Sequence, residues 1–135
     1  MLFTQKSEVD IHEMSPLALA FVGDAVLELL VRARLVGTTR LQPNRLHTVA
    51  THYVSAHAQN LELDIIEPML TDAEAAVLRR GKNASKATVA KHATVQEYRA
   101  STGFECLLGW LYLQGGNDRI EELFKAMWDG DKPAE

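Results

Sequence analysis

Apolar side chains recur every three or four residues along most of this chain, which is the spacing of one face of an α-helix. The longest such segment is SPLALAFVGDAVLELLVRARL, residues 15–35. Ser15 and Pro16 form a strong start signal, because serine caps a helix and proline at the first helical position loses no needed donor. Gly37 is the expected stop. The pattern predicts a buried face made of Phe21, Val22, Ala25, Val26, Leu29 and Leu30.

Further helices are expected along the rest of the chain. One begins at Pro43 and is followed by a short apolar segment over residues 61–68. Two T-x-x-E sequences then mark helix starts, at Thr71 and Thr94, because the two side chains of such a box cap each other's backbone N–H groups. The helix after Thr71 is expected to end near Gly81.

The segment GKNASKATVAKHA, residues 81–93, has no helical face and is the expected functional loop. The helix after it is expected to run to the glycine pair at 115–116, and a last helix is capped by Asn117 or Asp118. No segment alternates with a period of two for long enough to favour a sheet. The predicted fold class is therefore all-α.

Length and composition fit one domain over residues 1–135, with its core at about 15–128. A chain of 135 residues can bury a sizeable core, and its 47% hydrophobic and 24% charged residues are average for a globular protein. Cys106 is the only cysteine, which fits a reducing cytoplasm. The N-terminus lacks the layout of a signal peptide, and the longest apolar run is interrupted by Gly23 and Asp24, so no membrane span is expected.

Charge is unevenly distributed along the chain. The net charge of −4 argues against a polyanionic partner, yet residues 79–99 hold six basic residues and one acid. A locally basic surface on an acidic protein can still attract phosphate. A solvated loop explains the same run, and both interpretations stay open on charge alone. The basic residues are Arg79, Arg80, Lys82, Lys86, Lys91 and Arg99.

Two acids lie within apolar segments. Asp24 is the only ionisable side chain in residues 17–27, and an ionised carboxylate among apolar side chains is costly unless it is paired. Glu105 lies in STGFECLLGWLYL, with small residues about one turn away on both sides. Two carboxylates on facing helices suit Mg²⁺, which keeps several waters and takes one or two protein carboxylates. Spacing alone also allows both acids a purely structural role.

Three separated segments carry a resemblance to a known family: LALAFVGDA at 17–25, RRGKNASK at 79–86 and TVQEYRASTGFECLLGWL at 94–111. In this order they resemble the motifs of the ribonuclease III catalytic domain, and most closely those of its Mini-ribonuclease III branch. The resemblance spans Ser15 to about Met127. It implies a ribonuclease III-like endonuclease domain that forms a homodimer, without a separate double-stranded-RNA-binding domain.

The resemblance assigns roles to particular acids. Asp24 takes the place of the catalytic aspartate and Glu105 that of the metal-binding glutamate, so both are expected to hold Mg²⁺, for which Mn²⁺ can substitute. Ala20 and Thr102 stand where ribonuclease III has two further acids, which implies a larger share of water in the coordination shell and leaves one or two metals per site open. Glu28 is either an outer acidic group of the site or a surface charge.

The implied activity is hydrolysis of both strands of double-stranded RNA by a metal-activated water. The basic residues from Arg79 to Arg99 are then the expected RNA contacts, since duplex RNA is recognised mainly through phosphates and 2′-hydroxyls. The branch implies precursor 23S (large-subunit) ribosomal RNA as substrate, while the cleavage position and any ribosomal-protein helper stay open. The alternative is a catalytically silent ribonuclease III-like factor that binds RNA during ribosome assembly.

Overall fold

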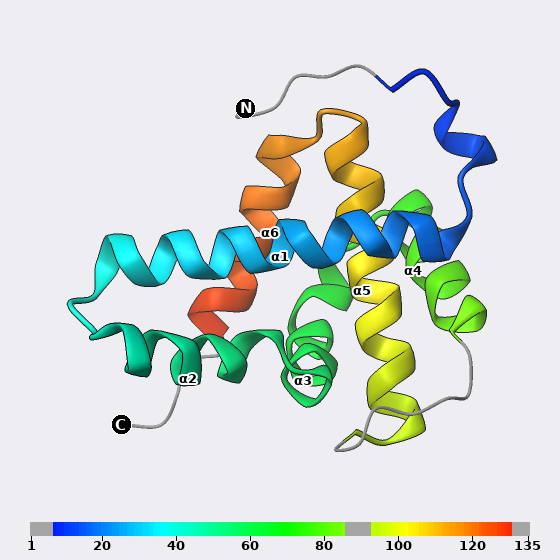
Figure 1. Ribbon diagram of the computed structural model, residues 1–135. Coiled ribbons are helices and arrows are strands. Elements are labelled where there is room, and N and C mark those ends of the chain that lie inside the picture. Colours follow the sequence, from blue (N-terminus) through cyan, green and yellow to red (C-terminus); the bar gives the residue numbers. More distant parts are fainter. Residues whose placement is uncertain (1–6, 86–92, 131–135) are drawn as a thin grey trace.

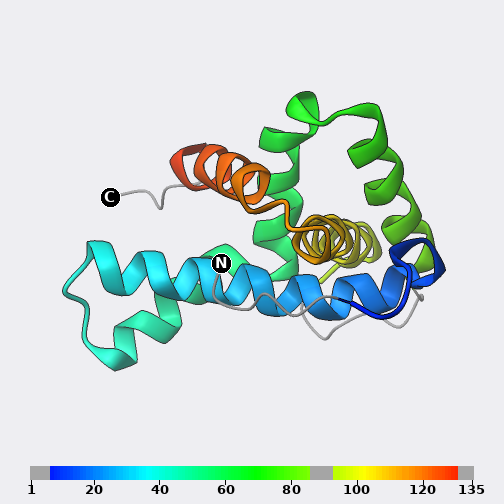
Figure 2. The same ribbon diagram turned by 90° about the horizontal axis from the view of Figure 1, so that it is seen from above.

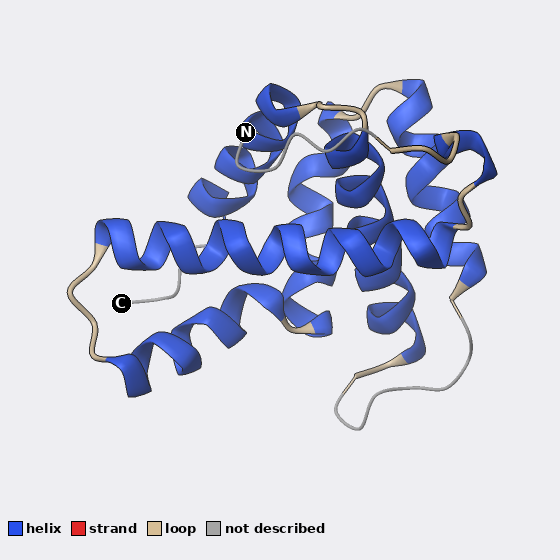
Figure 3. Cartoon of the chain, turned by 45° about the horizontal axis from the view of Figure 1, so that its top comes forward, coloured by secondary structure: helices blue, strands red, loops and turns tan. Residues whose placement is uncertain are grey.

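A computed structural model of the chain describes residues 7–85 and 93–130, and these residues form helices without any strand. The all-α prediction is confirmed. The longest helix passes in front of α5 and α6 in Figure 1, and Figure 3 shows that the described connections are short. The helices are α1 (Pro16–Thr38), α2 (Pro43–Val54), α3 (Ala56–Ile66), α4 (Asp72–Ala84), α5 (Val95–Leu113) and α6 (Asn117–Gly130), with short 3₁₀ turns at Ile11–Glu13 (η1) and Glu67–Met69 (η2).

Helix α5 is the centre of the molecule. Figure 2 shows it end-on, with α1, α3, α4 and α6 around it, and each of these helices contacts it. Phe104 and Leu107 of α5 are almost completely buried and pack with Leu27 and Val31 of α1 and with Met127 of α6. Burial of side chains of this size typically contributes about 1.5–3 kcal/mol each. The central helix thus ties the other elements into one core.

The face of α1 that packs inward differs from the predicted one. The buried residues are Leu19, Ala20, Gly23, Leu27, Val31 and Leu35. Phe21 is 82% exposed and Leu29 54% exposed, and Ala25 is exposed as well, whereas Val26 and Leu30 pack partly against the core. Because α1 has apolar residues on two sides, periodicity could not decide which side meets α5.

Glycines allow α1 and α5 to cross with their backbones in contact. A Cβ atom built on Gly23 would lie 1.6 Å from the carbonyl oxygen of Glu105. A Cβ atom on Gly109 would lie 1.9 Å from the carbonyl oxygen of Leu19. No side chain fits at either position, so the crossing depends on both glycines.

Most predicted helix ends are confirmed. The Ser15 hydroxyl accepts from the Ala18 N–H, and both T-x-x-E boxes are closed in both directions. Helix α5 ends where Gly115 adopts a φ of +75°, and the Gly116 N–H donates to the Leu111 carbonyl at 2.8 Å. Neither predicted cap of α6, Asn117 or Asp118, precedes the helix, because Asn117 is already its first residue.

Two further boundaries were predicted wrongly. The segment after Pro43 is broken at Ser55, which ends α2 and caps α3, so most of residues 61–68 belongs to α3. Helix α4 continues past Gly81 to Ala84, because Gly81 packs against α5: a Cβ atom there would lie 2.7 Å from Cys106 Cβ. Residues 81–84 of the predicted loop are therefore helical, and 86–92 lie outside the described residues.

Helix α6 is held by aromatic and charged contacts. Trp128 stacks on Tyr53 of α2 with ring centroids 4.3 Å apart. Arg119 donates to both carboxylate oxygens of Glu74 and to the Met69 carbonyl, at 2.7–2.9 Å. These bonds join α6 to η2 and to the start of α4. None of the helices within the described ranges has an apolar stretch long enough to cross a lipid bilayer.

Candidate active site

The crossing of α1 and α5 brings Asp24 and Glu105 together. Asp24 follows Gly23, the residue whose missing side chain lets the Glu105 backbone approach. The two carboxyl groups lie close enough that the charge of Asp24 acts on Glu105. Asp24 is exposed and Glu105 is partly buried, so the expectation that Asp24 lies among apolar side chains is wrong. The Asp24 carboxylate, which forms the outer side of the pair, is open to water.

The surroundings of Glu105 favour its protonated form. Burial, followed by the charge of Asp24, raises its pKa from an ordinary value of 4.5 to about 8. A hydrogen bond from Gln59 acts in the opposite direction, and the charge of Glu28 adds a small upward contribution. Two like charges this close oppose each other's ionisation unless a cation lies beside them. The pair therefore has the electrostatic character of a cation site.

Gln59 is a site residue that the sequence analysis missed. It is only 2% exposed, and its Nε2 donates to Glu105 Oε2 at 3.3 Å. The next turn of α3 places Glu62, which is completely buried, on the same side of the helix. An amide carries no charge and matches no motif, so only its position among the buried residues of α3 could have drawn attention to it.

Glu28 combines the two roles that were left open. Its Oε2 accepts from Arg32 Nε at 3.0 Å, a surface pair one turn apart on α1. Its charge also contributes to the raised pKa of Glu105. Glu28 is therefore a surface charge whose field extends to the acidic pair.

Ala20 and Thr102 turn away from solvent and toward α4. Ala20 is buried with Val77 and Cys106, and the Thr102 hydroxyl donates to the Tyr98 carbonyl at 3.0 Å and lies 3.3 Å from the Ser85 hydroxyl. Both positions are thus occupied by packing and by local hydrogen bonds. Within residues 7–85 and 93–130 no group of three or more His, Cys, Asp or Glu side chains could hold a metal. Metal binding here would depend on two carboxylates and water.

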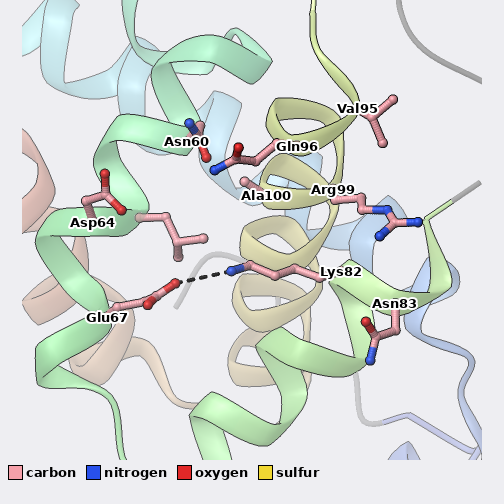
Figure 4. A pocket seen from close by; sticks show the side chains of 10 residues that line it. Asn60, Asp64, Glu67, Lys82, Asn83, Val95, Gln96, Arg99 and Ala100 are labelled. Atoms are coloured by element: carbon pink, nitrogen blue, oxygen red, sulfur yellow. Dashed lines mark hydrogen bonds and ion pairs between the residues drawn. The ribbon is translucent and has the colours of Figure 1, made fainter. Parts of the chain in front are cut away.

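The predicted basic surface is only partly assembled. Lys82 and Arg99 line one pocket of about 650 Å³ between α3, α4 and α5, where Figure 4 shows Lys82 reaching across to Glu67, 3.2 Å from its Oε1. Arg79 is exposed beside Lys82, whereas Arg80 lies near Cys106. Burial raises the pKa of the Cys106 thiol to about 11. Lys86 and Lys91 lie outside the described residues. The pocket also contains Asp64, so its charge is mixed.

Comparison with known proteins places this arrangement in a family. Residues 17–116 match the family model described as Ribonuclease III domain. The chain belongs to the ribonuclease III family. Within it, the chain is 46% identical over 116 residues to Mini-ribonuclease 3 of Enterococcus faecalis, covering 84% of this chain and 88% of that protein. It is 43% identical over 121 residues to Mini-ribonuclease 3 of Brevibacillus brevis, covering 88% and 90%.

A solved structure shares the fold of this chain. The crystal structure of a protein from Fusobacterium nucleatum superposes with a TM-score of 0.82 at 28% identity, covering 95% of this chain and all of the other. The family and the fold implied by the sequence motifs are therefore confirmed. Membership in the ribonuclease III family makes the chain an endoribonuclease by class.

Proposed function

We propose that this protein is a metal-dependent endoribonuclease that hydrolyses double-stranded RNA, with Asp24 and Glu105 as its metal-binding carboxylates. The observation that carries the proposal is the meeting of these two acids at the glycine crossing of α1 and α5. The ribonuclease III domain match over residues 17–116 supplies the class of reaction and the double-stranded substrate.

The two carboxylates fit a hard divalent cation. Glu105 is partly buried and is opposed by the charge of Asp24, so a cation between them would relieve a repulsion that the Gln59 hydrogen bond offsets only in part. The exposure of Asp24 leaves room for water, and Mg²⁺ usually retains several waters. Mn²⁺, which accepts the same oxygen ligands, is the expected substitute.

Each residue has a distinct task in this proposal. A bound divalent cation supplies an activated water and stabilises negative charge on the phosphate under attack. Asp24, at the exposed end of the pair, faces the side from which RNA arrives. Glu105 is the inner, partly buried ligand of the cation, and its carboxylate is kept in place by the hydrogen bond from Gln59 and by its position on α5. Ala20 and Thr102 contribute no charge, so the site operates with fewer anions than the four-acid pattern.

RNA is held by the basic residues near the ends of α4 and α5. Arg79, Arg80 and Arg99 are exposed, and Lys82 is half-buried in its pair with Glu67. Lys86 and Lys91 belong to the same proposed set. Contacts of this kind neutralise phosphates without reading the base sequence, which suits a protein that recognises the shape of a duplex.

The active form is a homodimer that covers the outer face of α1. Phe21, Ala25, Leu29 and Val36 fall on one side of that helix by their spacing and are exposed; we call them the exposed α1 stripe. Exposed apolar residues gathered on one helix face commonly mark an interface, and here the Glu28–Arg32 ion pair lies among them. The motif resemblance, which implies homodimers, favours a second copy of this chain as the partner.

Precursor 23S ribosomal RNA is the proposed natural substrate, and it rests on the resemblance to Mini-ribonuclease III alone. The second candidate is a silent RNA-binding factor, which the small number of acids at the site favours: no third acid joins Asp24 and Glu105 among the described residues. A direct assay of cleavage separates the two candidates.

The test uses a long RNA duplex with purified protein, in Mg²⁺ and in excess chelator. Asp24→Asn keeps the shape of an exposed side chain, so the fold is expected to persist while cleavage falls by about 100-fold or more, as removal of one charged catalytic group typically does. Glu121→Gln, an exposed acid on α6, is the matched control and should cleave normally. Cleavage in chelator, or undiminished cleavage by Asp24→Asn, would contradict the metal mechanism. Failure of the wild-type protein to cut any duplex would favour the binding factor.

A further inference from the structure

The orientation of the buried Gln59 amide is determined by its contacts. Its Nε2 lies 2.9 Å from the carbonyl oxygen of Val54 and 3.3 Å from Glu105 Oε2. A carbonyl oxygen can only accept, so the atom facing Val54 must be the amide nitrogen. The same NH₂ group has a second hydrogen to give, and it is directed to Glu105. Gln59 therefore connects the last turn of α2 to the acidic pair.

A second contact keeps Gln59 in place. His57, two residues earlier, meets the Glu97 carboxylate on α5 through its Nδ1 atom. Glu97 and Glu105 are eight residues apart and so lie on the same side of α5. Glu97 also closes the capping box with Thr94. The first turn of α3 thus contacts α5 at two points, through His57 with Glu97 and through Gln59 with Glu105. The Gln59 side chain is buried between the two helices.

The remaining polar atom of Gln59 is also informative. Its Oε1 is buried and has no hydrogen-bond partner among the described residues. A buried acceptor without a partner is costly, and an ordered water is the usual way to satisfy one. Beside two carboxylates that suit a hydrated cation, such a water would belong to the site itself.

From these contacts we infer that Gln59 is a positioning residue for the metal site: its amide holds one oxygen of Glu105 and leaves the other free to bind the cation. This inference rests on the proposed function. Groups that orient a metal ligand in this way typically change metal affinity by about 10–100-fold when they are removed. A purely structural role, joining α2 to α3, would affect stability alone.

Mn²⁺ binding to the RNA-free protein separates these roles. Electron paramagnetic resonance titration gives the affinity, and thermal unfolding gives the stability of each variant. Gln59→Met keeps the length of the side chain and removes both hydrogen bonds, so Mn²⁺ affinity is expected to fall by about 10–100-fold. Leu63→Val, one turn further along α3 and equally buried, should lower the Tm and leave Mn²⁺ affinity unchanged. Should Gln59→Met fail to fold, Gln59→Asn replaces it, because its shorter amide cannot span both partners.

Two results would overturn the inference. One is wild-type Mn²⁺ affinity in a folded Gln59 variant, and the other is an equal loss of affinity in Leu63→Val. Glu105→Gln and Asp24→Asn are measured alongside. If both bind Mn²⁺ as tightly as the wild-type protein, the metal site is not at this pair, and the proposed function fails together with the role of Gln59. If only the Gln59 variants bind normally, the proposed function survives and the positioning role is lost.

Discussion

Glu105 holds its proton at neutral pH unless a cation lies beside it. Its pKa of about 8 comes first from burial and then from the charge of Asp24, with Gln59 opposing both. Burial of Glu105 beside a second acid thus lowers the stability of the folded chain once Glu105 is ionised. A bound metal would remove much of that loss of stability. The protonation of this one side chain therefore reports on whether the site is loaded.

The first prediction concerns stability and pH without metal. The unfolded chain releases the Glu105 proton near 4.5, whereas the folded protein keeps it until about 8, so the stabilising contribution of the protonated form is lost as pH rises through this window. Glu105→Gln lacks this loss. Its Tm should match the wild type near pH 5 and exceed it by several degrees above pH 8, since 1 kcal/mol moves the Tm of a domain of this size by about 4 °C.

Thermal unfolding in chelator, followed by circular dichroism from pH 5 to pH 9, measures the difference. Added Mg²⁺ should stabilise the wild-type protein at high pH and reduce the difference in Tm between it and Glu105→Gln. Parallel curves for the two proteins at every pH would show that Glu105 ionises normally.

At this scale the sequence was informative where a residue carried a charge or belonged to a motif. The two acids were identified by the FVGDA and FECLLG segments. The physical reason first attached to Asp24, a carboxylate among apolar side chains, was wrong, because the side chain is exposed. Gln59 was missed because its role comes from contacts with Val54 and Glu105, which are 5 and 46 residues away along the chain.

Among the elements, the crossing of α1 and α5 is the joint on which the site depends. Caps and turn signals predicted most helix ends, since these are local and need only a few residues. The buried face of α1 and the continuation of α4 past Gly81 could not be predicted in this way. Both depend on which surface of α5 lies opposite, and that surface is determined by the packing of the whole fold.

The second prediction tests the crossing with two glycine variants on different helices. Gly109→Ala places a Cβ atom 1.9 Å from the Leu19 carbonyl, where neither backbone can yield, so a destabilisation of about 3 kcal/mol or more is expected. Gly37→Ala, near the end of α1, meets nothing within 4 Å and should be neutral or stabilising by up to about 1 kcal/mol. Urea unfolding gives both values. Equal stability of the two variants would show that the helices do not approach as closely as described.

For the whole molecule, the exposed α1 stripe is an apolar surface that the described residues leave open to solvent. A Phe at 82% exposure and a Val at 67% exposure lie on the helix that also carries Asp24. A homodimer through this stripe would place two acidic pairs in one particle, one for each strand of a duplex. Self-association and double-strand cleavage are therefore linked in the proposed function.

The third prediction follows from that stripe. Phe21→Lys introduces a charge into the proposed interface without touching the core, so the protein should remain folded and become monomeric. Sedimentation velocity measures the change, and Leu61→Lys, another exposed apolar residue on α3, is the matched control that should stay dimeric. A monomeric wild-type protein, or a dimeric Phe21→Lys variant, would show that the stripe has another role.

The contact of the two helix backbones at Gly23 and Gly109 also bears on how this protein can evolve. The spacing of the two carboxylates is determined by the contact between the two helix backbones and not by the side chains that fill the core. Volume-conserving exchanges of leucine or phenylalanine around the crossing are expected to leave that spacing the same. A single methyl group at either glycine would change it at once, so these two positions, which carry no chemistry, are expected to tolerate less variation than much of the core.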